Sequence, residues 1–228
     1  MVSYFKQHFE RLKIKFPGSE SIEKNYSQSF QDMFVLSVLN GKKNGFFFEI
    51  GAHDPEDLSN TYLLEKFDWT GISIDIDPRF EKPFLSKRKS KFLVKNALTC
   101  DYKELFKEYN VPSQVDYLQI DIEPQINTFN CLKMIPLDDY RFSVITFETD
   151  YYAKNIDRDI AEMVRTESRK ILESHGYLMV AGDVCTLGND PFEDWWVDPR
   201  VVDLDFVNKI KQSESFNDRS EKIILENI

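Results

Sequence analysis

The 228-residue sequence lacks the features that mark several classes of protein. Its three cysteines are odd in number and show no CxxC or Cys/His ligand spacing, so they indicate neither a disulfide framework nor a zinc site. No apolar run approaches the roughly 18 residues of a membrane span. Residues 1–16 are interrupted by charge, so we expect no signal peptide. These absences predict a protein of the reducing cytoplasm.

Positive charge is also scarce, with 29 Lys and Arg against 39 Asp and Glu and a formal net charge of −10. Contacts with phosphates need Lys and Arg, so this balance argues against nucleic acid as a partner. It equally argues against docking on anionic membranes. One basic run extends from Lys82 to Lys95, and the favoured interpretation is a solvated edge of a sheet.

Glycine is sparse, and the dinucleotide fingerprint G-x-G-x-x-G is absent. What is present is an apolar run, Phe46–Ile50, that contains Glu49 and ends at Gly51, followed by a second run that ends in Asp75. This is the order of a nucleotide-binding βαβ unit, in which glycine lets the backbone turn past the ligand and the second acid bonds ribose hydroxyls. With one glycine and an acid two residues before it, S-adenosylmethionine fits better than NAD.

Short apolar runs alternate with helical patterns from Gly45 onward, which predicts a mostly parallel sheet with helices on both faces. The predicted strands are Phe46–Ile50, Gly71–Asp75, Phe92–Lys95, Val115–Ile120, Ser143–Phe147, Tyr177–Ala181 and an antiparallel Phe192–Val197. The predicted helices are Ser59–Phe67, Tyr102–Tyr109, Gln125–Met134 and Asp157–Ser174.

The chain before this core has helical spacing. We expect an amphipathic helix over residues 1–16, and a second helix that Ser27 caps and Gly41 ends. The predicted organisation is an N-terminal helical extension packing on the core (1–44), one S-adenosylmethionine-dependent α/β domain (45–212) and a C-terminal tail (213–228).

Several segments together resemble the FkbM family of S-adenosylmethionine-dependent methyltransferases. They are Tyr26-Ser27-Gln28 with Gln31-Asp32, residues 49–55 (EIGAHDP), Ser59-Asn60-Thr61, residues 69–78 with Asp75 and Asp77, residues 116–123 (DYLQIDIE), and residues 145–148 (ITFE). Pro124 and Gln125 depart from the family pattern, which has glycine and an acid there. Proline suits the first turn of a helix, so the fold is expected to persist.

The resemblance implies a class I, Rossmann-like methyltransferase fold with a seven-stranded sheet, and transfer of a methyl group to a hydroxyl of a sugar or glycan. Two alternatives remain at this point. One is a non-catalytic protein that has kept the cofactor-binding fold. The other is a nicotinamide-dependent sugar-modifying enzyme, which predicts the missing glycine triplet.

The candidate cofactor-binding residues follow the motifs. Gly51 with Ala52 would approach the methionine moiety, Asp75 the ribose, and Asn96-Ala97 the adenine. Glu49 would reach the amino group or cap the next helix, and Asp77 would bind the cofactor or start a turn. The others are Asn60 and Thr61 at a helix start, Gln28, which the resemblance places near the cleft, and Asp121.

Acids also follow two neighbouring central strands, where ligands bind in open α/β sheets. Asp121, Glu123 and Glu148 are the candidate catalytic residues, because crowded carboxylates need a proton, a cation or a substrate to compensate their repulsion. A candidate Mg²⁺ or Mn²⁺ site consists of Asp121, Glu148 and Asp150. One of Trp195 and Trp196 is a candidate for stacking on a sugar.

Overall fold

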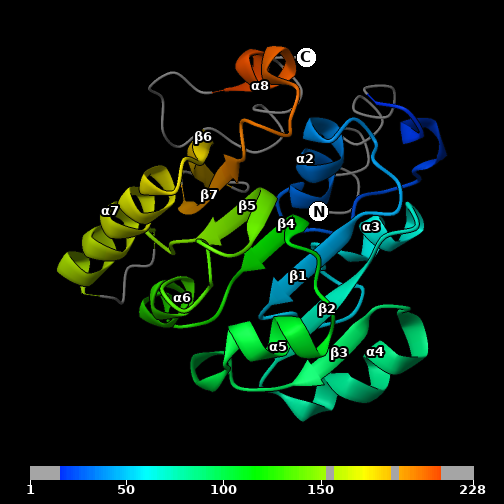
Figure 1. Cartoon of the computed structure of the whole chain (residues 1–228), viewed down its shortest axis with the longest axis horizontal. Helices are drawn as coiled ribbons and strands as arrows, with labels where there is room; N and C mark the ends of the chain where they lie inside the picture. Colours follow the sequence, from blue (N-terminus) through cyan, green and yellow to red (C-terminus); the bar gives the residue numbers. More distant parts are fainter. Residues whose placement is uncertain (1–15, 153–156, 186–189, 212–228) are drawn as a thin grey trace.

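The computed structural model describes residues 16–152, 157–185 and 190–211 (Figure 1). The predicted helix over residues 1–16 and the predicted tail 213–228 therefore lie outside the described residues, apart from Phe16. The predicted domain boundaries remain predictions. No helix among the described residues is long and apolar enough to cross a membrane.

The centre of the molecule is a seven-stranded sheet with the order β3-β2-β1-β4-β5-β7-β6. Its strands are β1 Phe46–Ile50, β2 Thr70–Asp75, β3 Lys91–Val94, β4 Gln114–Ile120, β5 Arg141–Glu148, β6 Leu178–Cys185 and β7 Pro191–Val197. β1 to β5 pair in parallel, and β7 is antiparallel to both β5 and β6. The predicted strands are confirmed, with the antiparallel strand inserted between β5 and β6.

Alternating side chains of the central strands fill two hydrophobic cores, one on each face of the sheet. On β4, Tyr117 belongs to one core and Leu118 to the other. Both faces are buried because helices cover them, which is why the strands read as nearly continuous apolar runs.

Helices cover both faces of the sheet (Figure 1). On the face of Tyr117 these are α2 Gln31–Val38, α3 Tyr62–Lys66 and α8 Leu204–Ile210. The face of Leu118 carries α5 Tyr102–Glu108, α6 Gln125–Leu132 and α7 Arg158–Ser174. α4 Glu81–Lys87 packs on β3 through Phe84 and Phe92, with ring centroids 4.4 Å apart. Short 3-10 turns occupy Ser19–Ser21, Pro78–Phe80 and Ala97–Thr99.

The start of α2 differs from the sequence prediction. Phe30, with φ of 62°, is the residue before the first helical turn, and its side chain forms no capping hydrogen bond. The Ser27 hydroxyl, three residues earlier, accepts from the N–H of Asp32 in the first turn at 3.3 Å and donates to Asp32 Oδ1 at 2.6 Å. The end agrees: Gly41 has φ of 65° and its N–H donates to the Leu36 carbonyl at 2.8 Å.

Candidate functional site

The site begins where β1 and β4 end side by side. Gly51 follows β1 with φ of +83°, and a Cβ there would lie 1.6 Å from the Asp121 carbonyl oxygen. The Asp121 N–H in turn donates to the Ile50 carbonyl at 3.0 Å. Only glycine fits a backbone approach this close, so the loop after β1 can run directly across the carboxyl ends of the strands.

Asp75 ends β2 next to this loop. Its Oδ2 accepts from the His53 N–H at 2.8 Å, and its Oδ1 accepts from the Asp77 N–H at 2.8 Å. These two amides fix the carboxylate, and each oxygen keeps a further lone pair for another donor. The geometry suits the predicted bonds to a pair of ribose hydroxyls.

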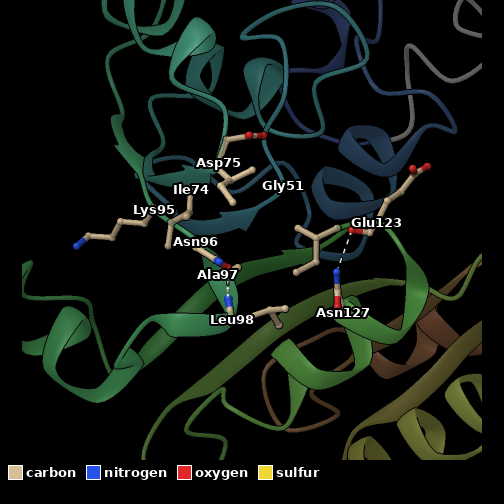
Figure 2. Close-up of a pocket in the computed structure, with 11 residues that line it drawn as sticks. Gly51, Ile74, Asp75, Lys95, Asn96, Ala97, Leu98, Glu123 and Asn127 are labelled. Carbon is tan, nitrogen blue, oxygen red and sulfur yellow. Dashed lines mark hydrogen bonds between the residues drawn. The ribbon is translucent and has the colours of Figure 1, made fainter.

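A cavity of about 110 Å³ lies beside Asp75 (Figure 2). Its walls are Gly51, Ile74, Asp75, Ile76, Lys95, Asn96, Ala97, Leu98, Ile122, Glu123 and Asn127. Mostly apolar walls with a few polar groups suit a flat heteroaromatic ring. The predicted Asn96-Ala97 therefore lines a pocket next to the predicted ribose acid, although the Asn96 side chain also accepts from the Leu98 N–H at 2.9 Å.

Asp77 is the residue before the 3-10 turn Pro78–Phe80, and its carboxylate accepts from the Arg79 N–H at 2.9 Å and forms an ion pair with the Arg79 guanidinium. The Arg79 hydrogen bonds hold the pKa of Asp77 below its usual value. The arrangement matches the alternative of a turn-starting acid.

Glu49 is buried on β1, and protein donors occupy both of its carboxylate oxygens. The Thr61 hydroxyl donates to Oε1 at 3.0 Å and the Ser73 hydroxyl to Oε2 at 2.5 Å. Burial raises the pKa of Glu49, and the charge of Arg88 opposes that shift. Glu49 therefore links β1 to β2 and to Thr61, the residue before α3. This arrangement is closer to the predicted alternative of a helix cap than to a contact with the amino group of the cofactor.

Arg88 closes this network, although sequence reasoning placed it in a solvated basic run. Its side chain is fully buried and pairs with Glu65 at 2.7 Å. It also donates to the Thr61 hydroxyl at 2.8 Å and the Pro55 carbonyl at 2.9 Å. Arg88 thus holds the loop between β1 and α3, and its partners, distant in sequence, explain why a local charge pattern missed it.

Asn60 and Thr61 directly precede α3 instead of lying in its first turn as predicted, because the helix begins only at Tyr62, and both are buried. Thr61 bonds Glu49 and Arg88, whereas Asn60 Oδ1 has no hydrogen-bond partner among the described residues. Predicted Gln28 is exposed, and a parallel bridge between Ser27 and Leu58 places its segment beside the same loop. Predicted Ala52 is buried, and its N–H donates to the Ile74 carbonyl at 3.2 Å.

Asp121 directly follows β4, and Glu148 is the last residue of the adjacent strand β5. Their carboxyl groups form a hydrogen bond with each other. Burial raises the pKa of Asp121. Burial and the Asp121 charge raise the pKa of Glu148 well above its usual value. The hydrogen bond between them lowers the pKa of Asp121 and raises that of Glu148, so Glu148 is the protonated partner when the pair holds a single proton.

Two further acids surround the pair. Burial, then the charges of Asp121 and Glu123, raise the pKa of Asp150 to about 6. Glu193 lies opposite Glu148 on β7, and burial raises its pKa to about 8 even though it accepts from Trp195 Nε1 at 2.5 Å. Sequence reasoning missed Glu193, because only the antiparallel pairing of β7 with β5 brings it here. Predicted Glu123 is exposed at the rim.

The predicted metal site is not supported. Among the described residues, no group of three or more His, Cys, Asp and Glu has an arrangement that could hold a metal ion. The Asp121 and Glu148 carboxyl groups form a hydrogen bond with each other.

The predicted sugar-stacking tryptophan is also wrong. Trp195 and Trp196 are both fully buried, one in each core. Trp195 stacks on Phe34 with centroids 4.4 Å apart.

No family model matches this chain, and no curated protein matches it. Several solved structures match its fold. The methyltransferase PaMTH1 of Podospora anserina, solved bound to SAH, aligns with a TM-score of 0.50 and 12% identity over 84% of this chain and 86% of its own. A candidate rRNA methylase from Clostridium thermocellum aligns with a TM-score of 0.50 and 12% identity over 74% and 92% of the two chains.

The fold is that of class I methyltransferases. At this identity the likeness shows the fold alone, and the FkbM resemblance remains a prediction. The residues present fit S-adenosylmethionine on three observations: the close approach that only Gly51 permits, the oriented Asp75 carboxylate with free lone pairs, and the apolar pocket next to it.

Proposed function

We propose that this protein is an S-adenosylmethionine-dependent O-methyltransferase that modifies a hydroxyl of a sugar or glycan. The observation that carries the proposal is the hydrogen-bonded pair Asp121–Glu148 at the ends of the central strands, next to Gly51. A methyltransferase acting on a hydroxyl needs a group that removes a proton, and a carboxyl pair with a raised pKa suits that task.

Gly51, Asp75 and the pocket around Asn96 and Ala97 would hold the cofactor, which supplies an activated methyl group when bound. The chain itself has to orient the acceptor oxygen, exclude water and take the proton. As the acceptor oxygen takes up the methyl group, its proton would pass to the Asp121–Glu148 pair, which would then carry two protons. The products would be S-adenosylhomocysteine and the O-methylated acceptor.

A saccharide is favoured as the acceptor by the FkbM resemblance and by charge. Asp121, Glu123, Glu148 and Asp150 form an acidic edge that accepts hydrogen bonds from hydroxyl groups, and the net charge of −10 disfavours a phosphate-rich acceptor. The localisation we propose is the cytoplasm, consistent with three free cysteines.

The test is mass spectrometry of a glycan pool incubated with the protein and cofactor labelled in the methyl group. The proposal predicts labelled O-methyl sugars. Label only in RNA or in protein side chains would overturn the acceptor class, and tighter binding of NAD than of S-adenosylhomocysteine would favour the nicotinamide alternative. Cofactor binding without transfer to any of the three pools would favour the non-catalytic alternative.

A further inference from the structure

Two buried amide oxygens next to the glycine loop have no hydrogen-bond partner in the described part of the chain. They are Gln119 Oε1 and Asn60 Oδ1, on residues that are 2% and 7% exposed. A buried acceptor without a donor is unfavourable, so folded proteins rarely keep one unless a ligand or water completes it. Two of them around one loop therefore point to a ligand with donor groups.

Gln119 lies in a position where the neighbouring strands cannot satisfy it. On β4 it pairs in register with Glu49 on one side and Thr146 on the other. The Glu49 carboxylate is an acceptor already engaged by Thr61 and Ser73, and the Thr146 hydroxyl bonds the Tyr117 hydroxyl at 2.7 Å. Neither neighbour donates to Gln119.

The strand pattern relates these groups to the candidate cofactor site. Gln119 and Asp121 lie on one face of β4, and Glu49 and Gly51 are their counterparts along β1. Asn60 adjoins Thr61, whose hydroxyl reaches Glu49. The pocket with Asp75 reaches from the ends of β2 and β3 to Gly51, so a nucleoside bound there would have its next group beside Gly51, toward Gln119 and Asn60.

We propose that the side-chain amides of Gln119 and Asn60 bind the charged amino-acid end of S-adenosylmethionine. This inference rests on the proposed function. An amide suits a zwitterion, because its oxygen accepts from the ammonium group and its NH₂ donates to the carboxylate. It also adds no further charge to an edge that already holds Glu49, Asp121 and Glu148.

The experiment compares two ligands by calorimetry. S-Adenosylhomocysteine carries the amino-acid end, and 5′-methylthioadenosine keeps the adenosine and sulfur but lacks it. We expect Gln119→Leu to weaken S-adenosylhomocysteine about 10- to 100-fold, the scale of a hydrogen bond to a charged group. Methylthioadenosine should change less than about twofold. Without ligand the variant should melt at the same temperature or higher, because it loses an unsatisfied buried amide.

Ser37→Ala is the matched control, since the Ser37 hydroxyl on α2 is also buried without a partner, and this variant should bind both ligands normally. If Gln119→Leu fails to fold, Gln119→Met, with an unbranched side chain like that of Gln, replaces it. Unchanged affinity for S-adenosylhomocysteine, or equal weakening of both ligands, would overturn the inference. If the parent protein binds neither ligand, the proposed function itself fails.

Discussion

Two buried acid clusters of this protein differ in how their charge is compensated. The arginine-paired cluster joins α7 to β6 and β7: Arg165 pairs with Asp183 at 2.5 Å, and Arg169 pairs with Asp183 at 2.9 Å and Asp194 at 2.7 Å. The edge acid cluster consists of Asp121, Glu148, Asp150 and Glu193, and none of these four forms an ion pair with an Arg or Lys of the described residues.

The pKa values show what this difference does. Burial opposes ionisation of Asp183, yet Arg165 and Arg169 bring its pKa below the usual value. Burial raises the pKa of Asp194, and Arg169 opposes that shift. In the edge acid cluster, burial and neighbouring acids raise the pKa of Glu148 and Asp150. The first cluster is a structural clamp in which arginines compensate both acids, and the second is a set of acids without such compensation, which supports the proposal that the second is the reacting site.

Asp121→Asn gives the largest expected effect. Removing the carboxylate that would accept the acceptor's proton should lower kcat about 10²- to 10⁴-fold, the usual contribution of a general base. Stability should be kept and S-adenosylhomocysteine affinity should change little. Steady-state transfer of labelled methyl groups measures kcat, and calorimetry measures affinity. Asp194→Asn is the contrasting variant, which should lose stability and keep its affinity; equal kcat in Asp121→Asn and parent would remove Asp121 from the chemistry.

Arg169→Ala breaks the arginine-paired cluster and should reduce the free energy of unfolding by about 3–5 kcal/mol, because it leaves Asp194 buried with an uncompensated charge. Urea denaturation followed by circular dichroism measures it. Lys170→Ala is the control, since Lys170 forms only an exposed pair with Glu167 at 2.7 Å, and it should cost less than about 0.5 kcal/mol. Similar costs for the two variants would contradict the structural role of the cluster.

Asp75→Ala should weaken S-adenosylhomocysteine by about 1.5–3 kcal/mol, the value of hydrogen bonds to a charged group. Asp77→Ala should cost less, because that carboxylate is already paired with Arg79. Calorimetry on both variants ranks the two acids. A larger loss in Asp77→Ala would move the ribose site from Asp75 to Asp77.

Glu193→Gln gives the smallest effect, in the pH dependence of stability. The folded protein holds the Glu193 proton up to about pH 8, whereas the unfolded chain releases it near 4.5. Glu193 therefore destabilises the fold progressively as pH rises between these values. The variant should gain about 1–2 kcal/mol over its parent between pH 5 and 8, because neighbouring acids absorb part of the titration. A constant difference from pH 5 to 8 would show that Glu193 is ionised throughout.

The sheet could be predicted from sequence because buried parallel strands leave apolar runs, and Gly51 and Asp75 could be located because they end such runs. α4 was missed because Pro83 interrupts its pattern, although proline is tolerated in the first turn of a helix. Arg88, Gln119 and Glu193 could not be assigned, since their roles depend on partners brought close only by the fold. The prediction that one of Trp195 and Trp196 stacks on a sugar was wrong, because adjacent residues of a strand face opposite sides of the sheet and both sides are buried cores here.

The central claim is that the carboxyl edge of this sheet binds S-adenosylmethionine, and its most direct test is calorimetric titration of the parent protein with S-adenosylhomocysteine and, separately, with NAD. The account predicts saturable binding of S-adenosylhomocysteine that Asp75→Ala weakens, and weak or no binding of NAD. Tighter binding of NAD, or no binding of S-adenosylhomocysteine to the folded protein, would contradict it.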